Sequence, residues 1–490
     1  MSRKLALTTI LEFILMGMLF VALKANTVKA SGIIYIRPEG NIDPPTALIS
    51  TIDNVTYTFT DDINDQIVIE RSNIIIDGNG HALQGSGNET GISLSNISNV
   101  TIKNTSIKIL GYGIYLNSSS NCTISGNNIT NCTRSIELYK ASNFNEIINN
   151  NLTNNVFAIY AWNQSNFNRI SDNNIAYNDS PAEIISLRQC QGTTISNNRI
   201  TNNRLDAIRL IQSTNNTIKA NNITSNHGYG IWLSDQSSSN IIAANELSDN
   251  NKGITLTSYS NDNTIIGNNI TNNGVYGVYL VQGTNNAFTH NNFIGNDKQV
   301  NVSLPNLPNI WNDELEGNYW SNYTGTDADH DGIGDTAHVL DASNIDNRPL
   351  MGMFHTYNTT IGQLVDVVSN STIINFMYFP LDSTIKLKVT NTTGTQTYGF
   401  CRIAISHTLM NTTNLTVIID EGITPVLFEN YTLHDNSTHR WIYFAYPHTI
   451  HEIIIIPESP TTTLLILLAT ATCLIATATR KAKPRRHPQN

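Results

Sequence analysis

The fold is decided by a short asparagine-centred stretch that keeps returning, as in Thr123–Asn131 (TISGNNITN), Glu146–Asn154 (EIINNNLTN) and Thr264–Asn272 (TIIGNNITN). Neighbouring copies of this stretch start a nearly constant distance apart, 23 to 25 residues. The same slot is held in eight consecutive copies by Asn127, Asn150, Asn173, Asn198, Asn221, Asn245, Asn268 and Asn291. A fixed period of this length is the signature of a solenoid, in which successive coils stack on one another.

A second motif lies between the asparagine stretches: a small residue, an isoleucine, a variable residue and a leucine, as in GIYL at Gly113 and GIWL at Gly230. This alternation is typical of a short strand whose isoleucine and leucine face the core. Short strands joined by turns within each period predict an all-β fold, a right-handed parallel β-helix with about nine or ten coils in residues 91–300. We interpret the repeated asparagines as a structural ladder: each adopts a left-handed turn conformation and bonds to the asparagine of the next coil.

The chain on either side of the coils differs in composition. Residues 31–90 are expected to form an N-terminal cap and the first coil, because a solenoid needs covered ends. Residues 301–353 are expected to form the C-terminal cap, with Trp311, Tyr319 and Trp320 as apolar lids. Residues 354–457 lose the period and contain longer alternating strands, which predicts a membrane-proximal β-sandwich.

Both ends of the chain carry apolar segments. Residues 5–23 follow Arg3 and Lys4 and predict a signal peptide over residues 1–30, with an uncleaved anchor as the alternative. Residues 461–479 are uncharged and precede a basic tail, residues 480–490, which predicts a transmembrane helix with a cytoplasmic C-terminus. The body of the protein is then extracellular, and sequons outside the coils, such as Asn391, are candidate glycosylation sites.

Charge and cysteine content narrow the classes of function. The formal net charge of -10 provides no basic surface, so we expect no nucleic-acid partner. The five cysteines are scattered without a metal-binding spacing. Cys122 and Cys132 fall in one coil and could pair, but buried free thiols are the favoured interpretation.

The variable residues of the second motif form a file on the outer side of one sheet. Aromatic rings on a flat sheet suit stacking against the apolar faces of sugar rings, which predicts a glycan ligand. The alternative is that exposed aromatic residues merely favour strands. The file contains Ser93 and Thr255 together with the candidate ligand-binding residues Tyr115, Glu137, Tyr160, Arg209, Trp232 and Tyr279.

Catalysis has less support in the sequence. Cleavage of a glycosidic bond uses two carboxylates that lie close together. Glu137 is the only acid in the file, and Glu183, Asp206 and Asp235 flank it without an obvious gathering point. We therefore assign no catalytic residue and expect binding rather than catalysis.

An acidic loop in the predicted C-terminal cap is the clearest metal-type motif. Carboxylates at alternate positions followed by a glycine are how a loop wraps oxygen ligands around Ca²⁺. The candidate ligands are the side chains of Asp327, Asp329, Asp331 and Asp335 with the carbonyl of Ile333. The loop resembles the calcium loops of thrombospondin type 3 and dockerin-like repeats; the alternative is a solvated acidic turn.

The coils resemble the right-handed β-helix of the periplasmic copper-binding NosD-type family, within the wider group of carbohydrate-binding and sugar-hydrolase β-helices. GNYWSNYTGTDADHDGIGD (residues 317–335) with NIDNRPLM (residues 344–351) is similar to a cap found in archaeal surface proteins. RWIYFAYPHTIHEIIIIPESP (residues 440–460) is similar to the membrane-proximal ending of such proteins. The resemblance implies copper delivery to nitrous oxide reductase, whereas the dispersed histidines show no pairing with cysteine or methionine and predict no copper site.

These observations together predict a single-pass membrane-anchored surface protein whose β-helix binds polysaccharide or envelope glycan. A β-helix lyase, hydrolase or epimerase, and copper handling, are the alternatives. Calcium is expected as a structural ion.

Overall fold

The computed structural model describes residues 32–457 apart from residues 305–306, 395, 413, 421–424, 429–430 and 448–449. The predicted signal peptide, transmembrane helix and basic tail lie outside the described residues. Within those described residues, no helix has the length and apolarity needed to cross a membrane.

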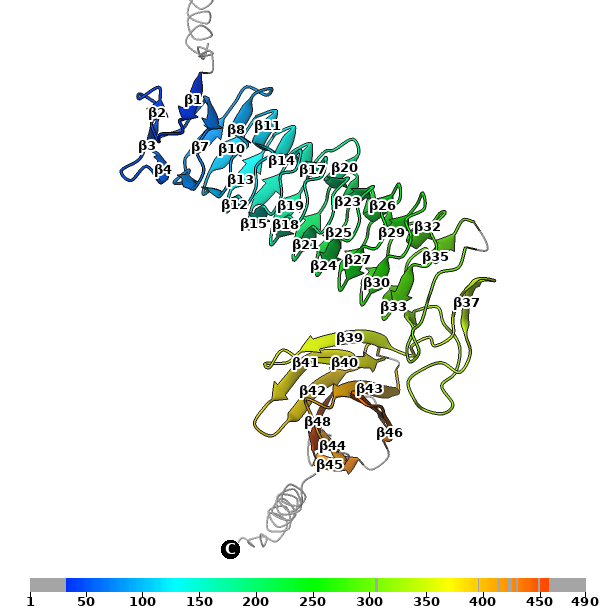
Figure 1. Cartoon of the computed structure of the whole chain (residues 1–490). Helices are drawn as coiled ribbons and strands as arrows, with labels where there is room; N and C mark the ends of the chain where they lie inside the picture. The colour runs from blue at the N-terminus through cyan, green and yellow to red at the C-terminus, as the bar shows by residue number, and fades with distance from the viewer. Residues whose placement is uncertain are drawn as a thin grey trace, which may run out of the picture.

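The first part of the molecule is a right-handed parallel β-helix whose three long sheets run side by side along its axis (Figure 1). Sheet A contains, in spatial order, β2 (Ile42–Asp43), β1 (Ile33–Ile36), β5 (Gln66–Ile69), β8 (Thr90–Ser95), β11 (Tyr112–Asn117), β14 (Arg134–Tyr139), β17 (Phe157–Trp162), β20 (Glu183–Arg188), β23 (Asp206–Ile211), β26 (Tyr229–Ser234), β29 (Lys252–Leu256), β32 (Tyr276–Leu280) and β35 (Lys298–Val302).

Sheets B and C supply the other two sides of each coil. Sheet B contains β3 (Ile49–Ser50), β4 (Thr56–Phe59), β6 (Ile74–Asp77), β9 (Val100–Lys103), β12 (Thr123–Ser125), β15 (Glu146–Ile148), β18 (Arg169–Ser171), β21 (Thr194–Ser196), β24 (Thr217–Lys219), β27 (Ile241–Ala243), β30 (Thr264–Ile266) and β33 (Ala287–Thr289). Sheet C contains β7 (Ala82–Gln84), β10 (Ser106–Lys108), β13 (Asn128–Thr130), β16 (Asn151–Thr153), β19 (Asn174–Ala176), β22 (Arg199–Thr201), β25 (Asn222–Thr224), β28 (Glu246–Ser248), β31 (Asn269–Thr271), β34 (Asn292–Ile294) and β36 (Tyr319–Trp320).

The number of coils is larger than the sequence predicts. Sheet C has 11 strands, one for each coil, against the expected nine or ten. The difference arises at the two ends. Strands β5, β6 and β7 within residues 31–90 already pair in parallel with β8, β9 and β10 of the repeats, and β36 adds a last strand at the other end.

The core is a set of apolar columns, one for each sheet. The isoleucine of the second motif is 0% exposed in every coil from Ile92 to Ile254. In sheet B, Ile124, Ile218 and Ile265 are also 0% exposed. Branched side chains pack well on stacked strands, and burying each one contributes about 2 kcal/mol. At the C-terminal end the column changes to rings: Phe293 stacks on Trp320 with centroids 4.2 Å apart, and both are buried.

The asparagine ladder is confirmed as a structural device, and the hydrogen bonds show how it works. The Oδ1 atom of each ladder asparagine accepts from the backbone N–H of the preceding ladder asparagine at 2.9–3.0 Å, as in Asn127 to Asn150. The column ends where Asn318 donates to the carboxylate of Asp346 at 2.8 Å. A second ladder runs from Cys132 through Asn155 and its equivalents to Asn296.

One detail of the ladder prediction is wrong. The left-handed backbone belongs to the residue before each ladder asparagine, with φ between 52° and 65° at Gly126, Asn149, Asp172, Asn197, Ala220, Ala244, Gly267 and His290. This turn residue points away from the core, which leaves the following asparagine, 0–2% exposed, to bond along the stack. The turn position therefore tolerates several residue types, whereas the ladder position of this column is asparagine in all eight copies.

The second part of the molecule is a pair of five-stranded antiparallel sheets around their own core, which includes Val367, Ile403 and Ile455. The first sheet contains β39 (Met353–Asn358), β40 (Leu364–Ser369), β43 (Tyr398–Ser406), β47 (His439–Pro447) and β46 (Thr432–Asp435). The second contains β41 (Thr372–Phe379), β42 (Thr384–Thr390), β48 (His451–Pro457), β44 (Leu415–Asp420) and β45 (Pro425–Phe428). A two-stranded hairpin of β37 (His338–Asp341) and β38 (Asn344–Asp346) precedes them.

The β-sandwich folds back beneath the last coils, on the side away from sheet A (Figure 1). Asn292 of β34 fixes the contact, because its side chain donates to the carbonyl of Phe354 and accepts from the Phe354 N–H, both at 2.8 Å. The outer side of sheet A therefore stays open along the coils.

Candidate functional site

The predicted file of variable residues exists on the outer side of sheet A. Strand pairing places them in one line in the order Ser93, Tyr115, Glu137, Tyr160, Ser186, Arg209, Trp232, Thr255 and Tyr279. We call the outer side of the sheet A strands from β8 to β32 the binding face, because it carries the predicted ligand-binding residues. Three members do not reach its surface, since neighbouring side chains cover them: Glu137 is 2% exposed, Ser186 is 0% exposed and Thr255 is 1% exposed.

A second aromatic file, which the sequence analysis missed, lies beside the first. Tyr112, Phe157, Tyr229 and Tyr276 each stand three residues before a member of the first file and contact it. The ring centroids are 5.5 Å apart for Tyr112 and Tyr115, 5.9 Å for Phe157 and Tyr160, 5.3 Å for Tyr229 and Trp232, and 5.2 Å for Tyr276 and Tyr279. Four coils of the binding face therefore present pairs of rings. The signal was present in the sequence as an aromatic residue that opens YGIYL, FAIYA, YGIWL and YGVYL.

Glu137 organises the side chains around it. Its carboxylate accepts from Arg134 at 2.6 Å and from Nε1 of Trp162 at 2.7 Å. The Trp162 ring in turn packs against that of Tyr139 in a tilted arrangement, with centroids 4.3 Å apart. A carboxylate held in this way is a support for the rings and the guanidinium, and it is not available to a ligand.

The flanking acids gather more closely than the sequence predicts. Glu183 of β20 and Asp206 of β23 are direct strand partners, whereas Asp235 lies apart in an exposed turn after β26. Glu183 and Asp206 come together because each stands three residues before a member of the first file. Glu183 is 0% exposed and accepts from Ser186 at 2.9 Å and from Arg188 at the same oxygen. Burial raises the pKa of Asp206 to about 6, although its carboxylate accepts from the N–H of Tyr229 at 2.9 Å.

Arg209 connects this acidic pair to the aromatic files. Its guanidinium carbon lies 3.6 Å from the centre of the Trp232 ring, a cation–π contact. Its Nη1 lies 3.6 Å from Oε2 of Glu183, and its Nε forms no hydrogen bond with any described residue. The binding face therefore combines flat rings with fixed guanidinium groups, an arrangement that suits a polar ligand with apolar faces.

The acidic loop brings three of its four predicted carboxylates together. One oxygen each from Asp327, Asp329 and Asp331 lies within 4.8 Å of the others. Burial raises the pKa of both Asp327 and Asp331, despite backbone N–H groups that donate to them. Asp335 stands apart from this group, since its carboxylate accepts from the N–H of Ala328 at 2.8 Å.

The side chain of Ile333, whose carbonyl is the remaining candidate ligand, is buried against Leu350 in the small core beside the sandwich. A further cluster, which the sequence analysis did not identify, is formed near the N-terminus by Asp61, Asp62 and His81.

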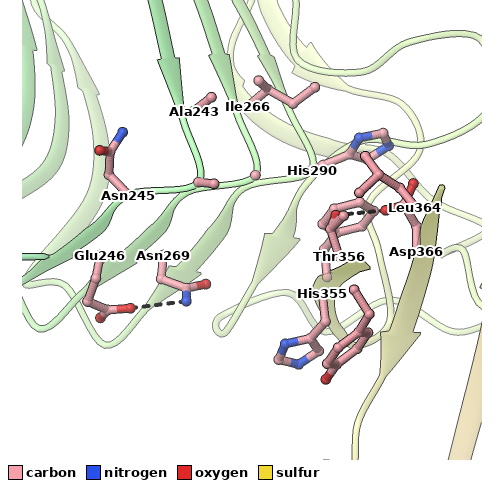
Figure 2. Close-up of a pocket in the computed structure, with 14 residues that line it drawn as sticks. Ala243, Asn245, Glu246, Ile266, Asn269, His290, His355, Thr356, Leu364 and Asp366 are labelled. Atoms are coloured by element: carbon pink, nitrogen blue, oxygen red, sulfur yellow. Dashed lines mark hydrogen bonds between the residues drawn. The ribbon is translucent and has the colours of Figure 1, made fainter. Parts of the chain in front are cut away.

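A hollow of about 520 Å³ separates the last coils from the β-sandwich (Figure 2). Figure 2 shows Glu246 and Asn269 of the coils on one side, joined by a 3.0 Å hydrogen bond, and Thr356 bonded to Asp366 on the other. The ring of His290 stacks on that of Phe354, with centroids 4.3 Å apart. Burial by itself lowers the pKa of His290, but the adjacent Glu316 carboxylate outweighs burial and raises it. The hollow is a product of domain packing, and nothing in the sequence pattern marks it.

A family model described as "Periplasmic copper-binding protein (NosD)" matches residues 26–186 and 182–325, more than half of the chain. The chain belongs to the NosD family. Two curated relatives carry the description "Probable ABC transporter binding protein NosD". The protein from Pseudomonas aeruginosa is 41% identical over 63 residues, and that from Stutzerimonas stutzeri is 38% identical over 63 residues. The match spans 13% of this chain and 14% of each relative.

The solved structures to which this NosD-family chain is similar share less of its sequence. The periplasmic alginate epimerase AlgG is 15% identical, with a TM-score of 0.40, over 54% of this chain and 78% of that protein. The catalytic domain of a GH87 alpha-1,3-glucanase is 15% identical, with a TM-score of 0.39, over 54% of this chain and 63% of that protein.

The description of the NosD family implies a copper site. Copper favours imidazole, thiolate and thioether ligands. In the part of the chain that the structure describes, the histidine, cysteine and acid groupings are Asp61–Asp62–His81 and Asp327–Asp329–Asp331, which are dominated by carboxylates. The described cysteines are buried free thiols, and burial raises the pKa of Cys132 to about 11 and of Cys190 to about 12. The described residues do not fit a copper site of this kind.

Proposed function

We propose that this NosD-family protein is a membrane-anchored surface protein that binds polysaccharide, or a glycan of the cell envelope, along the binding face. The observation that supports the proposal is the double file of rings, with Tyr112, Phe157, Tyr229 and Tyr276 paired to neighbours in the first file. Coils repeat about every 4.8 Å, so a chain of sugars laid along the axis would meet a similar surface at successive units. The apolar segments at residues 5–23 and 461–479 support export and anchoring.

The arrangement of the acids favours binding over cleavage. A glycosidase needs two carboxylates that both reach the sugar, about 5 to 9.5 Å apart. Glu183 is 0% exposed and engaged by Ser186 and Arg188, so it cannot reach a ligand without rearrangement. Asp206, the strand partner of Glu183, therefore has no accessible carboxylate partner at this place. The alternative of a lyase, hydrolase or epimerase is the weaker one.

Glycan-array binding of the full-length protein in detergent tests the proposal. Substitution of Tyr115, Tyr160 and Trp232 together by alanine should weaken binding at least tenfold, because each stacked ring contributes about 1 kcal/mol. Tyr259→Ala is the matched control, since Tyr259 is an exposed ring, 59% accessible, in a turn outside the binding face. Unchanged binding by the triple variant would exclude the face as the glycan site. Appearance of shortened, epimerised or unsaturated sugars would instead support an enzyme.

Calcium binding by the acidic loop is a second proposal, supported by the approach of Asp327, Asp329 and Asp331 within 4.8 Å. Such an ion would be structural, because Nη1 of Arg402 in the sandwich donates to the Asp331 carbonyl at 2.7 Å and ties the loop to that domain. Addition of Ca²⁺ to chelator-treated protein should raise the melting temperature, and Asp329→Asn should remove the effect. An unchanged melting temperature in the parent protein would identify the loop as a solvated turn.

A further inference from the structure

The charges of sheet A differ in sign from those of the whole protein. The nine strands of sheet A from β8 to β32 contain four cations and three acids, which gives a net charge of 4 − 3 = +1. The full chain carries a net charge of -10. The cations are Arg134, Arg188, Arg209 and Lys252, and the acids are Glu137, Glu183 and Asp206. A local positive field on an acidic protein concentrates anionic ligands at that place.

Burial separates the two signs further. The acids are 2%, 0% and 8% exposed, so they lie beneath the surface of the binding face. The side chains of Arg134, Arg188 and Arg209 are 27%, 36% and 20% exposed. A ligand on this face therefore meets guanidinium groups and rings, while the compensating carboxylates lie out of its reach.

Two of the guanidiniums share a single buried carboxylate. Glu183 accepts a hydrogen bond from Arg188, and its other oxygen lies 3.6 Å from Nη1 of Arg209. Arg188 lies 5.5 Å from the centre of the Tyr160 ring, and Arg209 lies 3.6 Å from that of Trp232. Glu183 thus holds two cations of successive coils, on β20 and β23, between the aromatic rings of β17 and β26.

Arg209 also keeps hydrogen-bonding capacity. Its Nε and the Oε2 of Glu183 are buried and make no hydrogen bond with any described residue, so a ligand reaches Arg209 through the Nη groups of its 20% exposed side chain. A guanidinium offers five donors and matches carboxylate and sulfate oxygens well. The pair Arg188 and Arg209 therefore has the charge, the donors and the fixed position that recognition of an acidic group requires.

We infer that the glycan bound on the binding face is an acidic polysaccharide, and that Arg188 and Arg209 receive its anionic groups while Tyr160 and Trp232 stack on its rings. This inference rests on the proposed glycan-binding function and specifies its ligand. Carboxylate and sulfate groups share the chemistry that this pair recognises, and the experiment below separates them.

Affinity measurements on full-length protein in detergent test the inference. The carboxylate probes are polygalacturonate, polymannuronate and hyaluronate, each compared with its carboxyl-reduced neutral form. Dextran sulfate compared with dextran provides the sulfate arm. We expect at least one acidic polymer to bind ten times more tightly than its neutral counterpart, with an affinity that falls as salt is added.

Variants locate the effect. Arg188→Gln with Arg209→Gln should weaken acidic binding at least tenfold and change neutral binding less than twofold, and Arg188→Lys with Arg209→Lys should retain part of the affinity. Arg169→Gln is the matched control, because Arg169 is 47% exposed on sheet B, outside the binding face. Its acidic binding should be unchanged, and melting temperatures verify that all variants are folded.

Two outcomes overturn the inference and differ in what they leave standing. Neutral forms that bind as tightly as the acidic polymers remove the acidic ligand but leave the glycan-binding function intact. If neither acidic nor neutral polymers bind, both the inference and the proposed function are rejected. A loss of affinity in the Arg169→Gln control equal to that of the double variant would also reject the assignment to Arg188 and Arg209.

Discussion

Arg402 of strand β43 donates from Nε to Oε1 of Glu316, a residue 86 positions earlier in the chain, at 2.7 Å. The pair is buried, with side chains 6% and 7% exposed, and it joins the β-sandwich to the cap of the β-helix. On its other side Glu316 lies 3.1 Å from Nε2 of His290 in the last coils. Burial raises the pKa of Glu316, but His290 and Arg402 outweigh burial and lower it, so the carboxylate stays ionised at the junction.

Arg402→Met should destabilise the protein strongly. Removal of one partner leaves the Glu316 carboxylate buried with less compensation, which costs about 3–5 kcal/mol. The measurement is the free energy of unfolding from urea titration, followed by fluorescence. Lys386→Met is the control, since Lys386 is 31% exposed and 3.7 Å from Glu452, and a surface pair contributes at most about 1 kcal/mol. Equal effects of the two substitutions would show that the junction pair is not a special contact.

Asn221→Ala should destabilise the coils, whereas Asn222→Ala next to it should not. Asn221 accepts from both the backbone N–H and the side-chain Nδ2 of Asn198, and it donates to the carbonyl of Ile195. Each buried group left without a partner costs about 1–3 kcal/mol, so a loss of about 2–4 kcal/mol is expected. The side chain of Asn222 is exposed, and its loss should change stability by less than about 0.5 kcal/mol. Melting temperatures that fall equally would contradict the ladder as a source of stability.

Gly192→Ala should be destabilising because of the ring above it. Gly192 has φ of 66°, and an added Cβ would lie 2.4 Å from Cδ1 of Phe167. Phe167 stacks on Phe144 with centroids 5.2 Å apart, so a displaced ring would also lose this contact. We expect a loss of about 1–2 kcal/mol from the left-handed backbone and up to about 1.5 kcal/mol from the stack.

The same substitution in a Phe167→Asn background isolates the second part. Only the backbone contribution should remain there, so the double-mutant cycle should give a coupling of about 0.5–1.5 kcal/mol. Additive effects would show that the Phe167 ring moves aside without loss of stability.

Acidic-glycan affinity should depend on pH through Asp206. Its pKa is raised by burial to about 6, so the carboxylate becomes protonated as the pH falls through that value. The charged residues of β8 to β32 then sum to +2 in place of +1, and sugar carboxylates, with pKa values of roughly 3.5, stay ionised. Affinity for a polyuronate should therefore rise between pH 7.5 and pH 5.5. Asp206→Asn should give the higher affinity at both pH values, and a profile that keeps its slope in that variant would assign the titration elsewhere.

The effect of Asp206 on folding stability has the same direction with pH. Its folded-state pKa lies above the ordinary value, so its contribution to stability is complete below about pH 4 and disappears as the pH rises through 6. The ionised, buried carboxylate is thus mildly unfavourable for stability at neutral pH.

The sequence period predicted the solenoid, the asparagine column at Asn127 and the file at Tyr115. All three depend only on the spacing of the repeats and on alternation along a strand. The second aromatic file was missed because alternation fails at the small residue. Strand β11 pairs Tyr112 with Arg134 and Ile114 with Ile136, and it passes over Gly113. Strict alternation would place Tyr112 on the same side as Ile114, whereas its ring contacts Tyr115. The same irregularity hid the pairing of Glu183 with Asp206.

A third polar column was also absent from the prediction, for a different reason. It runs through Asn145, Asn168, Asn216 and Asn240 between sheets A and B, but Thr193 and Cys122 interrupt the asparagine pattern. A hydroxyl can accept the same bond, so the structure is continuous where the sequence is not. The hollow beside His290 and the junction at Arg402 arise from contacts between distant segments, which no local pattern encodes.

The ladder that ends at Asp346 has a consequence for how such a protein changes over evolutionary time. Every coil accepts from the coil before it and donates to the coil after it, so the two surfaces of a coil are interchangeable with those of its neighbours. Duplication or deletion of one whole coil in the middle of the array leaves each amide with a partner, while the terminal carboxylate still closes the column. Each added coil also lengthens the ring-bearing side of sheet A by one unit. Insertion or deletion of a gene segment that encodes about 23 residues, one coil, can thus change the length of this surface without altering either end of the β-helix.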